Sequence, residues 1–460
     1  MLDHRELKDW AQAQWGGCRL GDKRRTARIV RVGQAMAGRS SSSVPKQMQD
    51  WSSIKGAYRL FATDEVTHAA VSAPHWEEAR KLARVPGRGL VLFVQDQTEL
   101  DFGHKPDSFE LGFVGSTYGR GIEVQTTLCL VPDPSCAERP EVLGLALQSP
   151  WVRDHAPRKK VESEYARSKR RTEYDVWAES VEAIGAAPEP ESGTVWVTVG
   201  DRGGDIFSHM WTAHKLGWRC LIRSKHDRKL GTSDEQSNLH KKVRSLGSMG
   251  STSFFVRSRP GQKSRTAHLK VSYMAASLPG TARSKERSAL DVTCIRVWEE
   301  ASTSTANQPI EWILLTTLAV ESVSDALKLV WLYRHRWLVE EYHKCLKTGC
   351  SIEHRNLNHR DRLLALLGVL SIVAVLLLQL KTPNQRLKPP DELTQIVGLI
   401  TNAKEDLSTP SALLRRIAML GGFIGRKADG EPGWQTIWAG WTRLQDILWG
   451  FELARTLRCG

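Results

Sequence analysis

Residues 331–349 read WLYRHRWLVEEYHKCLKTG, and the interpretation of the whole chain starts from this stretch. At about 100° per residue of an α-helix, a polar and an apolar stripe fall on nearly opposite sides. The polar stripe holds Tyr333, Arg336, Glu340, Lys344 and Lys347. The apolar stripe holds Leu327, Trp331, Leu338, Tyr342 and Cys345. Two interpretations are open: a surface helix with i,i+4 ion pairs worth a few tenths of a kcal/mol each, or a site that presents one acid between fixed cations.

The composition is that of an ordinary globular protein with an excess of positive charge. Charged residues make up 25% of the 460 residues and hydrophobic residues 41%, which excludes a disordered or fibrous chain. Lysine and arginine number 65 against 51 acidic residues, a net charge of +14. This excess indicates a polyanionic partner, with nucleic acid favoured over a membrane surface. The length predicts two or three domains.

The cysteines and the apolar segments bound the compartment. The eight cysteines are scattered, without the spacing of zinc ligands, so we expect no structural zinc and a reducing compartment. The N-terminal residues MLDHRELKDWAQ lack the apolar core of a secretory signal, and none is expected. Segment 363–380 is just long enough to span a membrane. Polar interruptions and basic residues at both ends favour a buried core helix instead.

Two short apolar runs each lead to an aspartate. Residues 90–94 predict a buried strand that ends near Asp96, and residues 194–199 predict a second strand that delivers Asp201. Further strands are predicted at 124–131, 142–148 and 218–223, and helices at about 158–186 and 206–215. This order indicates a mixed α/β core. Residues 226–310, rich in Ser, Arg, Lys and Gly, predict an antiparallel β insertion whose last strand covers 310–317.

Both ends of the chain are predicted to be helical. Near the N-terminus, Asp22 is a predicted helix N-cap. The arginines that follow it are Arg24, Arg25, Arg28 and Arg31. Solvation and phosphate contact are both open for them. After a linker at 382–390, the last helix carries Trp434, Trp438, Trp441 and Trp449. These indoles suit either the domain's own core or a partner surface.

Three carboxylates in this pattern point to metal chemistry. Mg²⁺ prefers oxygen ligands and is commonly held by a few carboxylates together with substrate phosphates. Two such ions, about 3.5–4 Å apart, can activate a water and stabilise the leaving oxygen of a phosphoryl transfer. Asp96, Asp201 and Glu340 are the candidate ligands. The alternative is that the two aspartates only cap strand ends, where Asp is common.

The order strand–Asp, strand–Asp, β insertion, helix–Glu resembles the DDE transposases, which have a ribonuclease-H-like core. The stretch Y-R-H-R-W-x-x-E-E-Y-H-K-x-x-K-T-G further resembles the Tyr-Arg-Glu-Lys signature of bacterial cut-and-paste insertion-sequence transposases. Its four positions hold Tyr333, Arg336, Glu340 and Lys347. The similarity extends along nearly the whole chain, through LGDKRRTAR, GAYRLF, VGDR, RSKH and the Trp-rich C-terminal segment.

The resemblance implies a division of the chain into three parts. Residues 1–70 would form an N-terminal helical DNA-binding domain, and residues 71–383 a ribonuclease-H-like catalytic domain with its β insertion at about 226–318. Residues 384–460 would form a C-terminal helical dimerisation domain. The protein would be cytoplasmic, in a bacterium, and associated with the nucleoid. No membrane partner is expected.

The resemblance also implies a site. Asp96, Asp201 and Glu340 would bind two Mg²⁺ ions, for which Mn²⁺ could substitute. The phosphates near the cleaved end would be held by Tyr333, Arg336, Lys344 and Lys347, with Arg223 of RSKH nearby. Trp312 would stack on a base flipped from the duplex, unless it is simply a core residue of its strand. Arg24, Arg25 and Arg28 would contact the terminal inverted repeat, and the chain would act on target DNA as a synaptic homodimer.

The chain departs from related sequences at one motif. Where those often have Asp-Arg-Glu-Ala-Asp, this chain has Asp-Arg-Gly-Gly-Asp at 201–205, and glycine disfavours a helix start by about 1 kcal/mol per residue. The sequence therefore predicts a DNA transposase that excises and reinserts its element. Two other functions stay open: a structure-selective nuclease on the same core, and a non-catalytic, transposase-derived DNA-binding repressor.

Overall fold

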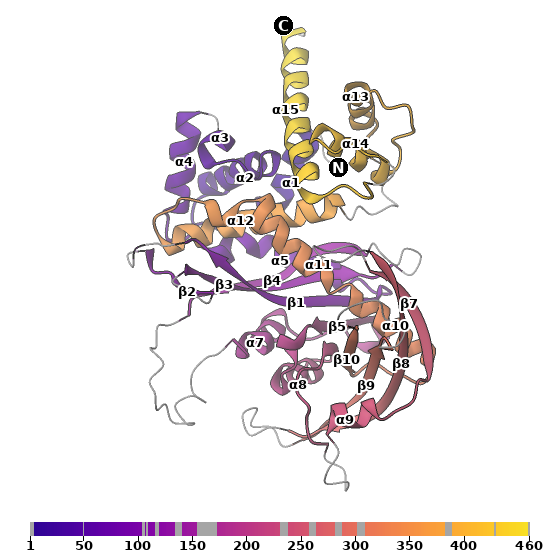
Figure 1. The fold of residues 1–460 in the computed structure, drawn as a ribbon. Helices are drawn as coiled ribbons and strands as arrows, with labels where there is room; N and C mark the ends of the chain where they lie inside the picture. Colours follow the sequence, from indigo (N-terminus) through magenta and orange to yellow (C-terminus); the bar gives the residue numbers. More distant parts are fainter. Residues whose placement is uncertain are drawn as a thin grey trace.

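The computed structural model describes residues 4–48, 50–103, 106, 109–115, 119–133, 140–153, 173–230, 238–256, 264–280, 288–300, 309–381, 389–426 and 429–458. A ten-stranded mixed sheet runs through the middle of the molecule, with helices above and below it (Figure 1). The strands are β1 (Gly89–Asp101), β2 (Gly112–Val114), β3 (Gly119–Val131), β4 (Glu141–Trp151), β5 (Thr194–Gly200), β6 (Arg219–Arg223), β7 (Gly250–Val256), β8 (Arg265–Leu278), β9 (Leu290–Trp298) and β10 (Glu311–Thr316). Their order is β2-β3-β1-β5-β6-β10-β9-β8-β7, and β4 pairs with β3.

The centre of the sheet has the ribonuclease-H-like arrangement that the resemblance implied. β4, β3 and β1 are antiparallel neighbours, and β5 and β6 then continue in parallel with β1. The mixed α/β prediction is thereby confirmed. The predicted insertion is also antiparallel throughout, and β10 pairs with β6, so the insertion extends the central sheet instead of forming a separate one. A short helix, α9 (Leu239–Arg244), accompanies it.

Helices cover both faces of this sheet (Figure 1). On one face lie α5 (His68–Ala83), α11 (Trp337–Lys344) and α12 (Arg360–Lys381). On the other lie α7 (Asp175–Ile184) and α8 (Phe207–Lys215). Helix α12 contains the apolar segment 363–380. It is the one helix within the described ranges that is long and apolar enough to cross a membrane, and 89% of its apolar window is buried, as the core-helix prediction expected.

The periodicity of residues 331–349 predicted one continuous helix, but the structure divides this stretch. Helix α10 (Val323–Arg334) starts with a capping box between Ser322 and Asp325 and stops before His335. After a turn, α11 begins at Trp337 and ends in a π-helical turn, η5 (Cys345–Gly349). The turn and the wider π-helical winding both change the angular position of the residues that follow. A stripe at constant helical spacing therefore does not describe residues 333–347.

Two helical layers lie beyond α12, on one side of the sheet (Figure 1). The N-terminal layer contains α1 (His4–Trp15), α2 (Lys23–Gly38), α3 (Val44–Met48) and α4 (Trp51–Phe61). Asp22 caps α2 as predicted, and Ile29, Val32 and Met36 are buried on its packed side. The C-terminal layer contains α13 (Asp391–Thr401), α14 (Pro410–Leu420) and α15 (Trp434–Arg458). Part of the predicted helix at 158–186 and most of the predicted linker at 382–390 lie outside the described residues.

The tryptophans of the last helix, α15, are divided between the core and the surface. Trp438 and Trp441 are buried, and the Trp441 indole donates a hydrogen bond to the Ala37 carbonyl of α2 at 3.0 Å. Trp449 is 46% exposed, and the exposed apolar surface continues to Leu457 at 81%. The first half of α15 thus belongs to the core. The second half projects from the molecule with apolar side chains in contact with solvent (Figure 1).

Candidate active site

Asp96 does not end its strand as predicted, because β1 continues to Asp101 through its pairing with β3. Along its other neighbour, however, the pairing stops at Val94, which is opposite Val199 of β5. Two residues beyond this pair lie Asp96, still in β1, and Asp201, directly after the end of β5. Because side chains alternate between the faces of a sheet, both carboxylates start from the same face. The register thus brings together two acids that are 105 positions apart in the sequence.

Asp201 follows β5 directly and caps a single 3-10 turn, η3 (Arg202–Gly204). Its Oδ1 accepts a hydrogen bond from the Gly203 amide at 2.7 Å, which fixes the start of this turn. The Trp177 ring packs against the same turn. A Cβ added at Gly203 would lie 3.1 Å from that ring, and one added at Gly204 only 2.9 Å. The glycine pair is therefore explained by close packing against the indole.

Glu340 is linked to Asp96 through an arginine. Arg336 lies in the turn between α10 and α11, and one of its guanidinium nitrogens is 3.8 Å from Asp96 Oδ2. The same guanidinium donates a hydrogen bond to Glu340 Oε1, one helical turn further on. The side chains of Arg336 and Asp96 are only 18% and 17% exposed. The third acid thus lies beside the first, with a partly buried cation between them.

The electrostatics of Asp96 reflect this crowding of acids. Burial is the largest cause, and the charge of Asp201 the second, of a rise in the pKa of Asp96 to about 7. Arg336 opposes the shift, and Glu340 adds to it. The carboxylates of Asp201 and Glu340 therefore both act on the buried Asp96, and Arg336 compensates only part of the negative charge of the three acids. Such a site favours binding of an additional cation.

The donor set suits a hard divalent cation, because all three candidate ligands are carboxylates and Mg²⁺ prefers oxygen. In the described ranges, no three Asp, Glu, His or Cys side chains are already gathered closely enough to hold an ion by themselves. In this structure the Arg336 guanidinium lies between the carboxylates of Asp96 and Glu340. The residues fit a metal by chemistry and by charge.

A phenol, a second arginine and an indole adjoin the acids. Tyr333 is buried at the end of α10, and burial raises its pKa to about 12, with Asp201 and Asp96 adding to the shift. Arg223 ends β6; burial lowers its pKa, and Arg202, Tyr333 and Asp201 all act on its charge. The Trp312 ring meets the Tyr333 ring edge-on, with centroids 5.6 Å apart. These predicted DNA-binding residues therefore surround the acidic site.

Three regions of the sequence match protein-family models. Residues 7–66 match the model described as transposase DNA-binding, and residues 152–376 match the transposase DDE domain. Residues 390–459 match the transposase Tn5 dimerisation domain. The chain has the three domains of a DNA transposase. The DDE-domain match contains Asp201 and Glu340, whereas Asp96 lies before its first residue.

The three matches favour a transposase over both other functions that the sequence left open. A DNA-binding domain, a DDE domain and a dimerisation domain occur in one chain, which supports an enzyme that acts on DNA. Neither the structure-selective nuclease nor the non-catalytic repressor is favoured by this composition.

Lys344 and Lys347 of the transposase are directed away from the three acids. Lys344 is half exposed and pairs with Glu341 at 3.0 Å. Lys347 lies in the π-helical turn and pairs with Glu353 at 3.4 Å. Glu353 in turn accepts a hydrogen bond from the amide of Asp101 at the end of β1. Both lysines thus form ion pairs near the site without contacting its acids.

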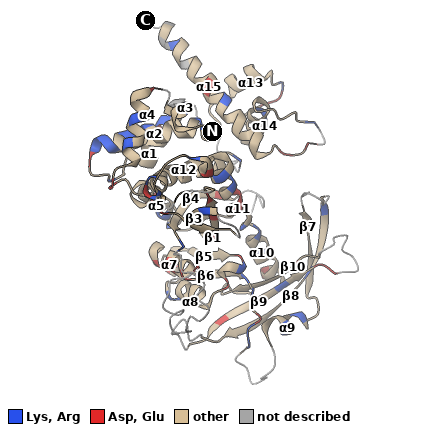
Figure 2. Cartoon of the chain, turned by 60° about the vertical axis from the view of Figure 1, so that its left-hand side comes forward, with Lys and Arg blue, Asp and Glu red and all other residues tan. Residues whose placement is uncertain are grey.

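The predicted N-terminal arginines lie in the N-terminal helical layer of the transposase, where several parts of the ribbon are Lys or Arg (Figure 2). The Arg24 side chain is 91% exposed and pairs with Asp22. Arg25 bonds the Leu20 carbonyl at 2.9 Å and pairs with Glu65 at 3.0 Å. The Arg28 guanidinium lies against Gly56 of α4. Of the three, Arg25 is held most firmly by the protein itself.

Sequence reasoning missed the residues that fix the position of α11 in the transposase. Glu341 is buried and accepts bonds from Lys344, Lys381 and the Trp434 indole, so it joins α11 to the end of α12 and the start of α15. On the sheet side, the Tyr342 hydroxyl accepts a hydrogen bond from the Gln148 amide of β4 at 2.9 Å. The only sequence signal was the adjacent Glu pair, which does not tell which Glu points inward.

Proposed function

We propose that Asp96, Asp201 and Glu340 are the metal-binding catalytic acids of this transposase, and that it cuts DNA at the terminal inverted repeats of its element and joins the freed ends to target DNA. One observation supports the assignment most: Arg336 links Asp96 to Glu340, while Asp201 and Glu340 both raise the pKa of Asp96. Three acids from a strand, a strand end and a helix thus share one electrostatic site.

Two bound Mg²⁺ ions, or Mn²⁺ in their place, would activate a water molecule and stabilise the leaving oxygen. In the first step the water oxygen forms a bond to phosphorus and the bond from phosphorus to the 3′ oxygen breaks, which frees a 3′-hydroxyl. That hydroxyl would then attack a phosphodiester of the opposite strand, as the family's hairpin route implies, so that the two strands close in a hairpin and the flanking strand leaves with its own 3′-hydroxyl. A second water would open the hairpin and restore the 3′-hydroxyl of the element, which would later attack a phosphodiester in target DNA. Each step is an in-line displacement, so positioning and charge neutralisation provide the rate.

The residues around the acids would hold the DNA. Arg336 and Arg223 provide partly buried cations beside Asp96 and Asp201. Tyr333 would add a hydrogen bond from its phenol, because burial keeps that phenol protonated. Lys344 and Lys347 would exchange their carboxylate partners for phosphates, because their side chains are 51% and 32% exposed and within reach of a ligand in solvent.

Trp312 would stack on a flipped base. Its ring is only partly buried, and the Phe254 ring packs parallel to it at 6.2 Å. A partly exposed indole with a supporting ring behind it suits an unpaired base, since stacking is worth about 1–3 kcal/mol per base. Arg24, Arg25 and Arg28 would contact the phosphates of the inverted repeat from the N-terminal layer.

The second half of α15 would be covered by a second copy of the transposase in the synaptic complex. It belongs to the matched dimerisation domain, and Trp449, Phe451, Leu453 and Leu457 are all exposed along it. We further propose the limits 1–70, 71–383 and 384–460 for the three domains, and a bacterial cytoplasm with nucleoid association as the location.

The test starts from the genome. Matched short inverted repeats flanking the coding region would define the DNA ends, and duplexes that carry them are then incubated with the transposase. With Mg²⁺ or Mn²⁺ we expect nicking at the repeat end, followed by strand transfer of pre-cut ends into a plasmid. With Ca²⁺ we expect binding without cleavage.

Two results would contradict the proposal. Cleavage that proceeds fully in a chelator would remove the metal from the reaction. Cleavage with Mg²⁺ but no joining of pre-cut ends would reduce the activity to that of a nuclease.

A further inference from the structure

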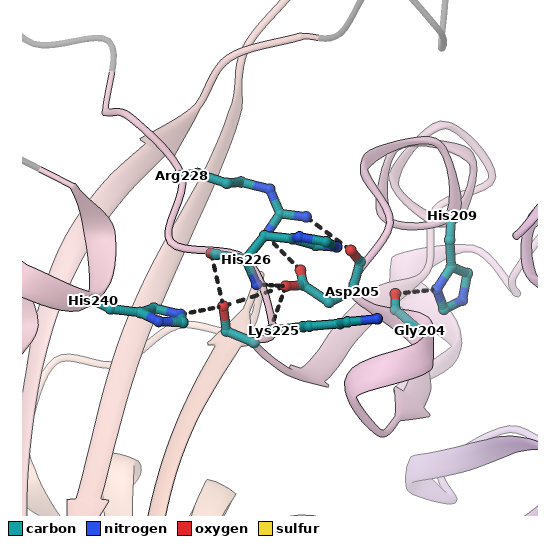
Figure 3. Close-up of polar contacts among 8 residues, drawn as sticks. Gly204, Asp205, His209, Lys225, His226, Arg228 and His240 are labelled. Carbon is teal, nitrogen blue, oxygen red and sulfur yellow. Dashed lines mark hydrogen bonds and ion pairs between the residues drawn. The ribbon is translucent and has the colours of Figure 1, made fainter.

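Asp205 is a fully buried carboxylate four residues after Asp201, with a side chain that is 0% exposed. Its Oδ2 accepts hydrogen bonds from the Lys225 amide at 2.6 Å and the His226 amide at 2.9 Å. Its Oδ1 pairs with Arg228 at 2.6 Å (Figure 3). No motif predicted a role for this acid, which belongs to the turn after Asp201 and contacts a different part of the chain.

The partners of Asp205 all belong to the segment that follows β6. That strand ends at Arg223, and residues 224–228 then fold over the Asp205 carboxylate. Arg228 also donates to the Asp205 carbonyl at 2.9 Å, so main chain and side chain are both bound. Two segments that each carry a site residue, Asp201 on one and Arg223 on the other, are thereby joined at a single carboxylate.

The turn is also held from its other side. His209 of α8 lies with Nδ1 3.0 Å from the Gly204 carbonyl (Figure 3). Its Nε2 lies 3.1 Å from the Thr198 hydroxyl of β5. Residues 204 and 205 are thus fixed to α8 and β5 on one side and to the segment after β6 on the other. These bonds restrict the conformation of the turn. Through Asp205 they also restrict residues 224–228, which follow Arg223.

A buried ion pair is not needed for stability alone, because well-packed apolar residues often serve as well or better. It is directional, however, since it fixes hydrogen-bond donors at set positions. Arg223 needs such a fixed position. Its own hydrogen bond is to the Glu311 carbonyl at 3.1 Å, and the parallel register that sets Ile222 opposite Gly200 places Arg223 beside Asp201. A small shift of the main chain after β6 would move the guanidinium away from the acids.

We propose that Asp205, paired with Arg228, is a positioning residue that fixes the main chain after β6 so that the Arg223 guanidinium faces the catalytic acids and a DNA phosphate. The inference rests on the proposed function, in which Arg223 holds a phosphate of the element end. Asp205 itself touches neither DNA nor metal and acts entirely through Arg223.

The experiment is a double-mutant cycle in the full-length transposase, with a duplex carrying the inverted repeat found beside the coding region. The variants are Asp205→Asn, Arg223→Gln and the double variant. The measurements are the Mg²⁺-dependent nicking rate at saturating DNA, the DNA affinity as a function of salt, and the melting temperature. Arg228→Gln is a second route, because it removes the ion pair but leaves the two amide donors to Asp205.

We expect Asp205→Asn to slow nicking roughly 10- to 100-fold, because a misplacement of about 1 Å has effects of this size. The slope of log affinity against log salt should fall by about one, as for Arg223→Gln, because one phosphate contact is lost in each case. In the Arg223→Gln background, Asp205→Asn should slow nicking no more than about 3-fold further, since coupled residues are not additive. Arg228→Gln should change rate and salt slope in the same direction.

The matched control is Glu141→Gln, which removes an ion pair with Arg88 next to the first residue of β1, at the end of the strand away from Asp96. It should leave the rate and the salt slope unchanged within about 2-fold. The inference is overturned if Asp205→Asn and Arg228→Gln lower only the melting temperature. It is also overturned if Asp205→Asn slows the Arg223→Gln variant as much as it slows the wild type. If Arg223→Gln nicks and binds DNA like the wild type, the proposed role of Arg223 is overturned, and the inference with it.

Discussion

Two groups of side chains on the signature helices behave differently, although they belong to one motif. The inner group is Tyr333, Arg336 and Glu340; Tyr333 is buried, and Arg336 pairs with both Asp96 and Glu340. The outer group, Lys344 and Lys347, pairs with carboxylates outside the site. The inner group is therefore already arranged around the acids, whereas the outer group must exchange partners to meet DNA.

The difference arises from the backbone. The turn at His335 and Arg336 rotates α11 relative to α10, and the π-helical turn then moves Lys347 out of phase with Glu340. Fixed groups cost no reorganisation in the reaction and should control its rate. Exposed cations that change partners should mainly control affinity and its salt dependence.

The largest effect is expected at the inner acid. Glu340→Gln keeps the shape of the side chain but removes its charge, so we expect cleavage to fall about 1,000-fold or more while DNA affinity stays within about 3-fold. Nicking assays and gel-shift titrations on the same duplex measure both. Glu353→Gln, which alters a carboxylate bound by Lys347 of the outer group and by the Asp101 amide, is the control. Undiminished nicking by Glu340→Gln would remove Glu340 from the catalytic acids.

The inner cation should affect both rate and affinity. Arg336→Ala removes the bridge between Asp96 and Glu340, and we expect roughly 100-fold slower cleavage with weaker DNA binding, because a fixed positive charge at the reacting phosphate is lost. Arg336→Lys keeps the charge without the two-pronged geometry and should recover only part of the rate. If both variants cut like the wild type, the inner group is not distinguished from the outer one.

The outer cations should affect affinity alone. For Lys344→Gln and Lys347→Gln we expect DNA binding about 3- to 10-fold weaker at moderate salt, with the salt slope reduced by about one for each. The cleavage rate at saturating DNA should be unchanged. Lys215→Gln, at an exposed lysine of α8 on the opposite face of the sheet, is the control. A rate defect at saturating DNA would move these lysines into the inner group.

The smallest effect on the reaction is expected at Glu341, which supports both groups through α11. Glu341→Gln should lower the free energy of unfolding by about 2 kcal/mol, because hydrogen bonds from charged partners are lost, and should change the cleavage rate little. Thermal and denaturant unfolding measure the loss. Glu392→Gln, in the exposed pair with Arg455, should cost about 0.5 kcal/mol or less.

The pH dependence of this difference follows from the pKa of Glu341. Burial would raise that pKa, but the ion pairs with Lys381 and Lys344 and the bond from Trp434 lower it below its ordinary value. A carboxyl group with a lowered pKa in the folded state stabilises the fold above its unfolded pKa of about 4.3, and this stability is lost as the pH falls through the folded pKa. The gap between wild type and Glu341→Gln should therefore close in acid. A gap that stays constant down to pH 3 would show that the charge of Glu341 is not involved.

Sequence patterns predicted the parts of this structure that depend on local order. The strands before Asp96 and Asp201, the strands of the insertion and the buried helix α12 followed from runs of apolar residues. The extension of β1 beyond Asp96 could not be read in this way, because it depends on pairing with β3 as far as Gly121. The turn at His335 and the π-helical turn interrupt a stretch whose apolar and polar residues keep helical spacing, so that spacing could not reveal them.

The site was predictable only through the resemblance. The composition indicated a basic chain, and the sequence pattern indicated three candidate acids. Neither predicted that Asp96 lies near Glu340. The groups that sequence reasoning missed, Glu341, Gln148 and Asp205, all act through partners far away in the chain. A single sequence carries no signal of such contacts.

The packing of Trp177 on the glycine pair constrains how this motif can change during evolution. A side chain at Gly204 would overlap the indole unless the ring moved, and Asp201 is bonded to the intervening Gly203 amide. The residues at 177, 203 and 204 must therefore change together, and a chain with larger side chains at 203 and 204 should carry a smaller residue at 177.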